Sequence, residues 1–211
     1  MIFGRKLGSL VVGVVAWLML GQGLSAAVEA QDLKADVHPV EWTVEQLVTL
    51  LKEQREPAVA FQESTYSSLL TEPLITRGFL RFTASETMEK QVTEPYRERY
   101  VIEGDTVTFE SERKKIKKTI SLEDYPSLRS FVEAFRASFT GDAAQLKQTY
   151  ETTIEGSRRK WTLLLRPRDP AGKSMVDYIL FSGSEGRIAT IAIRAPDGDR
   201  SVMTLLRGTS P

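Results

Sequence analysis

The hydrophobic positions near the end of the chain fall into four short runs, which predict four consecutive β-strands. The runs are Trp161–Arg166, Met175–Ser182, Arg187–Arg194 and Ser201–Arg207. They are rich in aliphatic, β-branched and aromatic residues, and glycine- or proline-containing turns separate them. Parallel neighbours would need crossovers of about a dozen residues, so we expect an antiparallel meander. Apolar side chains occur on both faces of the runs. Both faces must therefore be covered, or one must be kept for an apolar ligand.

Alternating apolar and polar residues predict further strands upstream, which gives about ten or eleven strands in total. Gly78 lies inside one of them and indicates a bend or a close approach of backbone. The expected upstream strands are Ala58–Thr65, Leu74–Phe82, Met88–Val92, Arg97–Ile102, Thr106–Ser111, Lys114–Leu122 and Tyr150–Glu155.

Two segments have the apolar spacing of amphipathic helices. The first begins after Thr43, which forms a capping box with Gln46. The second runs from Pro126 to Gly141, and Asp142–Lys147 is compatible with one further helical turn. Their apolar stripes are Val44, Leu47, Val48 and Leu51, and Leu128, Phe131, Val132 and Phe135. The fold class expected from these elements is α+β, with β-structure predominant.

The N-terminus has the pattern of a secretory signal peptide. Arg5 and Lys6 precede an apolar run, Leu7–Leu20, and small residues follow up to Ala27. We expect residues 1–27 to be cleaved, with a cut after Ala30 as the alternative. An uncleaved membrane anchor is disfavoured because the apolar run is shorter than the ~20 residues that cross a bilayer. The protein is therefore expected in the periplasm.

Composition is compatible with a single domain over residues 28–211. The chain has 211 residues, 41% of them hydrophobic, and 28 basic side chains balance 28 acidic ones. This length can bury a sizeable core. A neutral chain lacks the basic face that nucleic-acid binding requires, so we expect no nucleic-acid partner. We also expect the protein to be a monomer. The absence of cysteine excludes disulfides and a lipid-attachment cysteine.

The residues that common catalytic and metal sites require are missing. His38 is the only histidine, so a Ser-His-Asp triad has no base in the predicted domain core. Without cysteine, zinc and iron lack their usual ligands, and no aspartate-rich loop has calcium spacing. We expect no metal, no cofactor and no enzymatic activity, although 28 acids leave a carboxylate pair open.

Apolar residues are the remaining candidates for a site. They form either a filled core or the lining of a cavity, enclosed where two helices lie across the open side of a curved sheet; the pattern is compatible with both. The candidate cavity residues are Leu47, Leu51, Phe61, Leu80, Phe82, Val92, Tyr100, Phe109, Phe131 and Phe135.

The chain resembles the LolA family, the periplasmic carriers that move lipoproteins from the inner to the outer membrane. The resemblance covers most of the chain after residue 27. It is carried by the first helix with Leu47 and Leu51, by Phe61–Glu63, Gly78–Phe82, Thr93–Pro95, the turn Glu103–Asp105, the strand Trp161–Leu165 and the final meander.

The resemblance implies an incomplete antiparallel β-barrel with helices forming a lid over a hydrophobic cavity. The implied ligands are the acyl chains of a lipoprotein or lipid, and the implied partners are an inner-membrane release complex and an outer-membrane acceptor. Family members commonly carry an arginine after the glycine-containing strand, where it holds the lid shut. Here Ala84 and Ser85 occupy that place, and Met88–Lys90 replaces an aromatic-rich edge.

Three hypotheses for function follow. The protein is a lipoprotein chaperone, a LolA-like carrier of another lipid, or a sensor or interaction domain on the same fold that transports nothing. The basic segment Arg113–Lys118 likewise has two interpretations. In the first, its lysines keep a solvent-exposed strand edge from aggregating. In the second, they dock the carrier on an anionic headgroup or an acidic partner. The lysines are Lys114, Lys115, Lys117 and Lys118.

Overall fold

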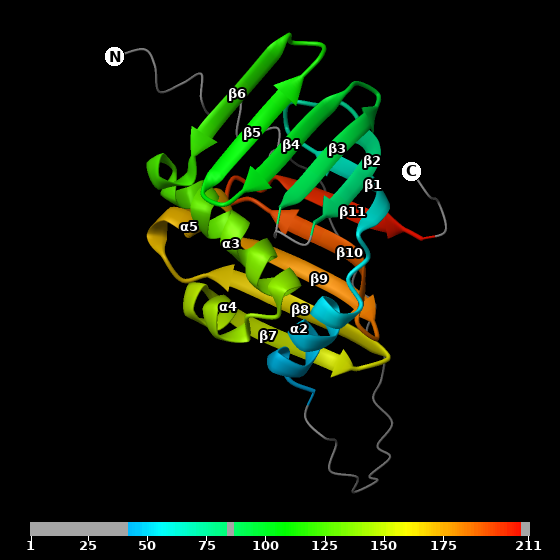
Figure 1. Cartoon of the computed structure of the whole chain (residues 1–211), viewed down its shortest axis with the longest axis vertical. Coiled ribbons are helices and arrows are strands. Elements are labelled where there is room, and N and C mark those ends of the chain that lie inside the picture. The colour runs from blue at the N-terminus through cyan, green and yellow to red at the C-terminus, as the bar shows by residue number, and fades with distance from the viewer. Residues whose placement is uncertain (1–41, 84–86, 208–211) are drawn as a thin grey trace, which may run out of the picture.

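The computed structural model describes residues 42–83 and 87–207. In this part of the chain, eleven strands form one antiparallel sheet in the order β6-β5-β4-β3-β2-β1-β11-β10-β9-β8-β7 (Figure 1). The strands are β1 (Ala58–Tyr66), β2 (Leu74–Phe82), β3 (Met88–Glu94), β4 (Glu98–Glu103), β5 (Thr106–Ser111), β6 (Ile116–Ser121), β7 (Tyr150–Ser157), β8 (Lys160–Pro167), β9 (Tyr178–Ser184), β10 (Arg187–Arg194) and β11 (Arg200–Leu206). The predicted α+β, mainly β class is confirmed. The predicted signal peptide lies outside the described residues.

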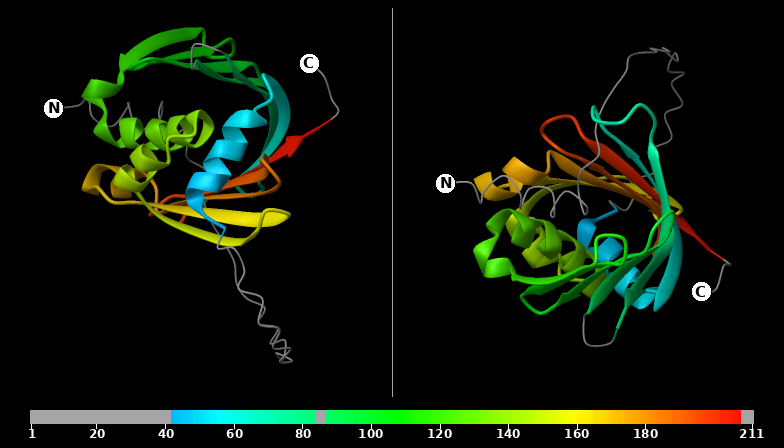
Figure 2. Two further views of the ribbon diagram at one scale, coloured as in Figure 1. Left: turned by 60° about the horizontal axis from the view of Figure 1, so that its bottom comes forward. Right: turned by 90° about the horizontal axis from the view of Figure 1, so that it is seen from above.

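The sheet curls without closing. Among the described strands, β6 and β7 are its two edges, and the half made of β1–β6 folds over the half made of β7–β11 (Figure 2). Helices lie between the halves, so the incomplete barrel predicted from the sequence is also confirmed. The helical elements are α2 (Val44–Glu53), the 3-10 helix η1 (Leu122–Asp124), α3 (Pro126–Thr140), α4 (Ala143–Thr149) and α5 (Pro170–Met175).

Gly78 on β2 permits a close approach of backbone, as its place in a strand predicted. A Cβ atom at this position would lie 1.8 Å from the carbonyl oxygen of Gln91 on β3. The β2–β3 register shifts between Arg77 and Gly78. The two strands can therefore pair at this irregularity only because position 78 has no side chain.

The ends of the two long helices follow the predicted capping chemistry. The Thr43 hydroxyl accepts a hydrogen bond from the Gln46 backbone at 3.3 Å, and the Gln46 side chain accepts one from the Thr43 N–H at 3.1 Å. Helix α3 has Pro126 in its first turn, and Gly141 ends it in the left-handed conformation with φ 82°. The capping box and both predicted helices are confirmed.

Two short helices were not fully predicted. Asp142 caps α4, which extends the single expected turn to Thr149. The sequence pattern predicted a turn before β9 and a strand that begins at Met175. This prediction is wrong, because helix α5 occupies residues 170–175 and β9 begins only at Tyr178. The Asp169 carboxylate accepts the Gly172 N–H at 2.7 Å, and Pro170 supplies a preset first helical residue. Together they start a helix where the sequence pattern indicated only turn residues.

The main core lies between the helices and the β7–β11 half. Its largest fully buried side chain is Trp161, whose indole N–H donates to the Glu185 carbonyl at 2.8 Å. The Tyr150 hydroxyl on β7 donates to the Ser130 carbonyl of α3 at 3.0 Å. This bond fixes α3 to the second half of the sheet. No helix in residues 42–83 and 87–207 combines the length and apolar character needed to cross a membrane.

The turn between β10 and β11 buries an acid. Asp199 is 1% exposed, and burial, followed by the nearby charge of Asp197, raises its pKa to about 7 from the ordinary 3.8. Between about pH 4 and pH 7 this carboxyl group therefore binds more protons in the folded protein than in the unfolded chain. We expect the free energy of unfolding to fall as pH rises through this window, and we expect Asp199→Asn to lack that fall. Urea unfolding at pH 5 and pH 8 measures both proteins; equal pH dependence in the two would contradict the prediction.

Candidate ligand cavity

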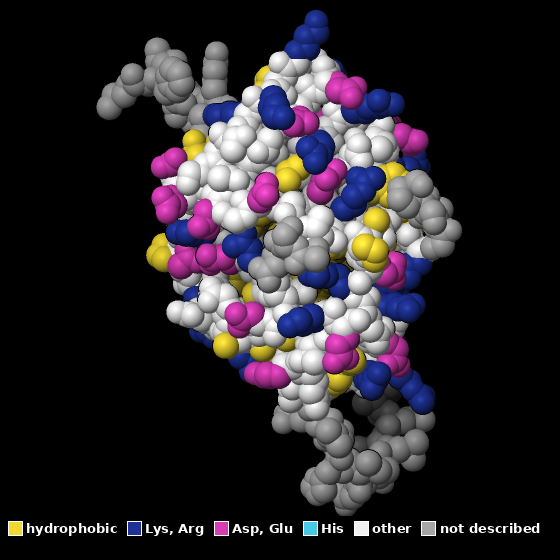
Figure 3. Space-filling view, viewed as in Figure 1, with side chains coloured by type: hydrophobic (Ala, Val, Ile, Leu, Met, Phe, Trp, Pro, Cys, Tyr) yellow, Lys and Arg dark blue, Asp and Glu magenta, His cyan; other side chains and the backbone are white. Residues whose placement is uncertain are grey.

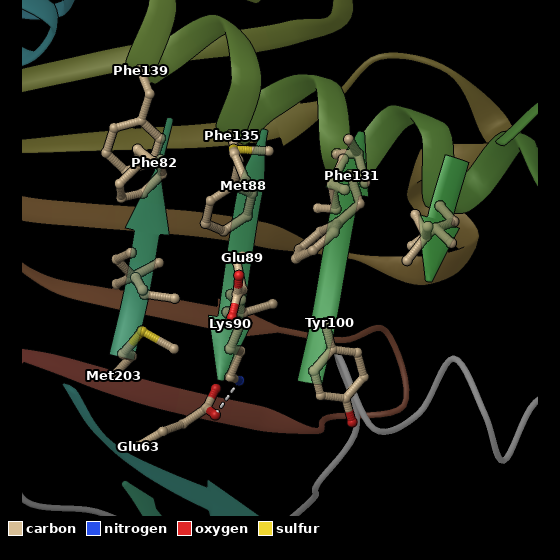
Figure 4. Close-up of a pocket in the computed structure, with 17 residues that line it drawn as sticks. Glu63, Phe82, Met88, Glu89, Lys90, Tyr100, Phe131, Phe135, Phe139 and Met203 are labelled. Carbon is tan, nitrogen blue, oxygen red and sulfur yellow. Dashed lines mark hydrogen bonds and ion pairs between the residues drawn. The ribbon is translucent and has the colours of Figure 1, made fainter. Parts of the chain in front are cut away.

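A cavity of about 110 Å³ lies between α3 and the inner face of the sheet. Its walls come from both halves of the sheet and from the helix (Figure 4). The lining residues are Glu63, Leu80, Phe82, Met88, Glu89, Lys90, Tyr100, Ile102, Val107, Leu128, Phe131, Val132, Phe135, Phe139, Ile191, Ile193 and Met203. The lining is apolar except for a few groups that gather at one end.

The end of the cavity beside α3 is aromatic. Phe82 at the end of β2 packs against Phe139 of the helix, with ring centroids 4.4 Å apart. Phe131 and Phe135 form a second pair at 4.9 Å, and Met88 also lines the cavity (Figure 4). The polarisable, ring-rich surface is well suited to contact hydrocarbon and offers it no hydrogen bond.

The opposite end of the cavity carries an ion pair. The Lys90 ammonium of β3 lies 2.5 Å from the Glu63 carboxylate of β1, with 16% and 8% of the two side chains exposed (Figure 4). The ammonium also lies 5.3 Å from the centre of the Phe61 ring. Phe61 pairs with Gly78 of β2 and is itself buried. The pair is thus enclosed beside apolar surface.

A second acid is buried next to this end. The Glu98 carboxylate accepts the Tyr100 hydroxyl at 2.9 Å and the Ser111 hydroxyl at 3.1 Å. Burial, with the charge of Glu98 as the next cause, raises the pKa of the Tyr100 phenol far above its ordinary value. Tyr100 therefore stays protonated and acts as a donor, and Glu98 keeps both oxygens paired.

Five of the ten sequence-predicted cavity residues line the cavity: Leu80, Phe82, Tyr100, Phe131 and Phe135. The other five lie buried in the surrounding core: Leu47, Leu51, Phe61, Val92 and Phe109. Their role in binding stays a prediction. Sequence reasoning missed the contributions of β10 and β11, namely Ile191, Ile193 and Met203, together with Met88 and the ion pair. The sequence did contain a signal for the ion pair. Glu63 and Lys90 each occupy a position that the alternating pattern assigns to the apolar, inward face of its strand.

Helix α3 is also fastened to the first half of the sheet. The Arg136 guanidinium donates to the Gly104 carbonyl at 2.5 Å, and Arg129 lies 3.3 Å from the Asp105 carboxylate. Gly104 and Asp105 form the turn between β4 and β5. Ala84 and Ser85, the place of the family's arginine, lie outside the described residues. In the part of the chain that the structure describes, Arg129 and Arg136 of α3 make the polar contacts between this helix and the β4–β5 turn.

The four predicted docking lysines do not form one surface. Lys117 lies 2.7 Å from Glu110 on the outer face, where acidic and basic side chains are interspersed over β2–β6 (Figure 3). Lys118 pairs with Phe109, whose side chain is buried on the inner face. Lys114 lies 4.0 Å from Glu98, and Lys115 has a left-handed backbone with φ 51°. Docking through these lysines stays a prediction.

A family model for outer membrane lipoprotein carrier proteins of the LolA-like type matches residues 35–211. The chain belongs to the LolA-like family. The predicted resemblance is therefore confirmed, and the family is one of carriers rather than known enzymes. No curated protein matches the sequence.

Several solved structures are similar to the chain at low sequence identity. A LolA superfamily protein from Nitrosomonas europaea has 13% identity and a TM-score of 0.42, over 81% of this chain and 96% of that one. A Thermus thermophilus protein has 9% identity and a TM-score of 0.46, over 77% and 83%. The Pseudomonas aeruginosa MucA/MucB complex contains a match with 11% identity and a TM-score of 0.40, over 80% of this chain and 58% of that one.

Proposed function

We propose that this LolA-like protein is a periplasmic carrier, which shields the acyl chains of a lipoprotein or lipid and delivers them towards the outer membrane. The observation that carries the proposal is the aromatic and aliphatic cavity between α3 and the curled sheet. We further propose that residues 28–211 act as one exported, monomeric, non-enzymatic domain. Its partners would be a release complex in the inner membrane and an acceptor in the outer membrane.

The energetics of acyl chains explain why such a cavity is useful. Each buried CH₂ is worth about 0.8 kcal/mol, so a long chain exposed to water costs on the order of 10 kcal/mol. Crossing an aqueous compartment therefore requires a shielded site. The cavity of about 110 Å³ is smaller than the several hundred Å³ typical of ligand sites, so it must widen to accept a full chain.

Mass spectrometry of material extracted from the purified exported protein tests the proposal. A triacylated peptide would identify a lipoprotein carrier, and a free lipid would identify the alternative, a LolA-like carrier of another product. A titration with an apolar fluorescent dye provides a second readout that needs no resident ligand. The absence of both co-purified acyl chains and dye binding would overturn the proposal and would favour the third hypothesis, an envelope sensor or interaction domain.

A further inference from the structure

We propose that the ion pair between Glu63 and Lys90 makes the cavity selective for amphiphiles with an uncharged polar group next to the acyl chain. Ester, amide and hydroxyl groups belong to this class, whereas phosphate, carboxylate and ammonium groups do not. This inference rests on the proposed function, because it concerns the polar end of the same acyl-chain cavity.

The position of the pair defines where a ligand's polar group would lie. Phe82 and Phe139 form one end of the cavity, while Glu63, Lys90 and the Tyr100 hydroxyl lie at the other (Figure 4). A hydrocarbon tail is favoured at the aromatic end because it gains apolar contact there. The first polar group of the same molecule then lies beside the ion pair.

The pair has capacity left for a neutral ligand. The ammonium of Lys90 has three donors, and its hydrogen bond in the described part of the chain goes to one oxygen of Glu63. A remaining N–H can donate to an ester or amide carbonyl. The second carboxylate oxygen of Glu63 can accept from a hydroxyl or amide N–H. One neutral group can therefore be bound without separating the two charges.

The charges at this end already balance. Glu63 is paired with Lys90, and Glu98 lies 4.0 Å from the Lys114 ammonium. An anionic headgroup would enter beside carboxylates whose cations are engaged. A cationic headgroup would meet Lys90. Either ligand would bring an uncompensated charge into an enclosed, largely apolar site, which is costly.

Three amphiphiles with the same twelve-carbon tail test the selectivity by dye displacement at pH 7, below their micelle concentrations. Monolauroylglycerol is neutral, dodecyl phosphate is anionic and dodecylamine is cationic. The unmodified protein should bind monolauroylglycerol about tenfold more tightly than either charged probe. Equal binding of all three would overturn the inference but leave the carrier function standing. If neither dye nor any amphiphile bound, the carrier function itself would fail.

Single substitutions should change the ranking in opposite directions. Glu63→Gln leaves one excess positive charge and should tighten dodecyl phosphate about tenfold, whereas Lys90→Gln should do the same for dodecylamine. The exchange Glu63→Lys with Lys90→Glu restores the balance and should restore the preference for monolauroylglycerol. Glu110→Gln, which breaks the outer-face pair with Lys117, is the matched control and should change nothing. Near-ultraviolet circular dichroism confirms folding, and an unchanged ranking in folded single variants would refute the role of the pair.

Discussion

Phe82→Glu is expected to abolish uptake of an apolar dye and to leave the protein folded. Phe82 lines the cavity, is only partly buried, and packs against Phe139 at 4.4 Å. A carboxylate there would lie against the Phe139 ring at the aromatic end of the cavity, and burying a charge in apolar surroundings costs several kcal/mol. Binding would have to supply that energy, so the dye affinity should fall at least about a hundredfold.

Phe79→Glu is the matched control for this experiment. Phe79 lies on the same strand and is also half-buried, but it is on the opposite parity, with the Arg81 guanidinium 5.5 Å from its ring. The same substitution there should leave dye binding unchanged within about twofold. If Phe82→Glu bound dye normally while remaining folded, the cavity beside α3 would not be the binding site.

Gly78→Ala is expected to destabilise the protein strongly, and far more than Gly104→Ala. The new Cβ would meet backbone, the Gln91 carbonyl oxygen at 1.8 Å, rather than the end of a flexible side chain. The β2–β3 ladder must separate locally to accommodate it. We expect the free energy of unfolding to fall by about 3 kcal/mol or more, measured by urea denaturation.

Gly104→Ala separates this steric effect from the general cost of replacing glycine. Gly104 has φ 51° and no atom within 4 Å of the added carbon. Only the strain of the left-handed backbone applies there, about 1 kcal/mol. Similar losses at both positions would show that the close approach of β2 and β3 is not what requires glycine at position 78.

Local chemistry made most of the fold predictable from the sequence. Alternating side chains marked the strands, and the capping box at Thr43 marked the start of α2. The main exception was α5, because proline and glycine, here Pro170 and Gly172, are also typical turn residues. Packing decides between the two: Asp169 also accepts the Ser130 hydroxyl of α3 at 2.9 Å, a contact between residues 39 apart.

The cavity was only partly predictable because it depends on how α3 packs against both halves of the sheet. The alternation of side chains along the strands placed Leu80 and Phe82 on the inner face, where they line the cavity. Phe61 and Val92 share that face but belong to the filled core. No local pattern separates the two groups. The pairing of Glu63 with Lys90 joins strands β1 and β3 across β2, so it depends on the order of strands in the sheet, which the local sequence pattern does not give.

The two attachments of α3 differ in strength, and this gives cavity opening a direction. Towards β7 and α5, the helix is held by the buried Tyr150 hydroxyl and by Asp169. Towards the β4–β5 turn, it is held by exposed arginine contacts at Gly104 and Asp105, which water can readily replace. The weaker attachment should yield first. We therefore expect the cavity to widen by separation of the β4–β5 turn from α3, while α3 stays packed on the β7–β11 half of the sheet.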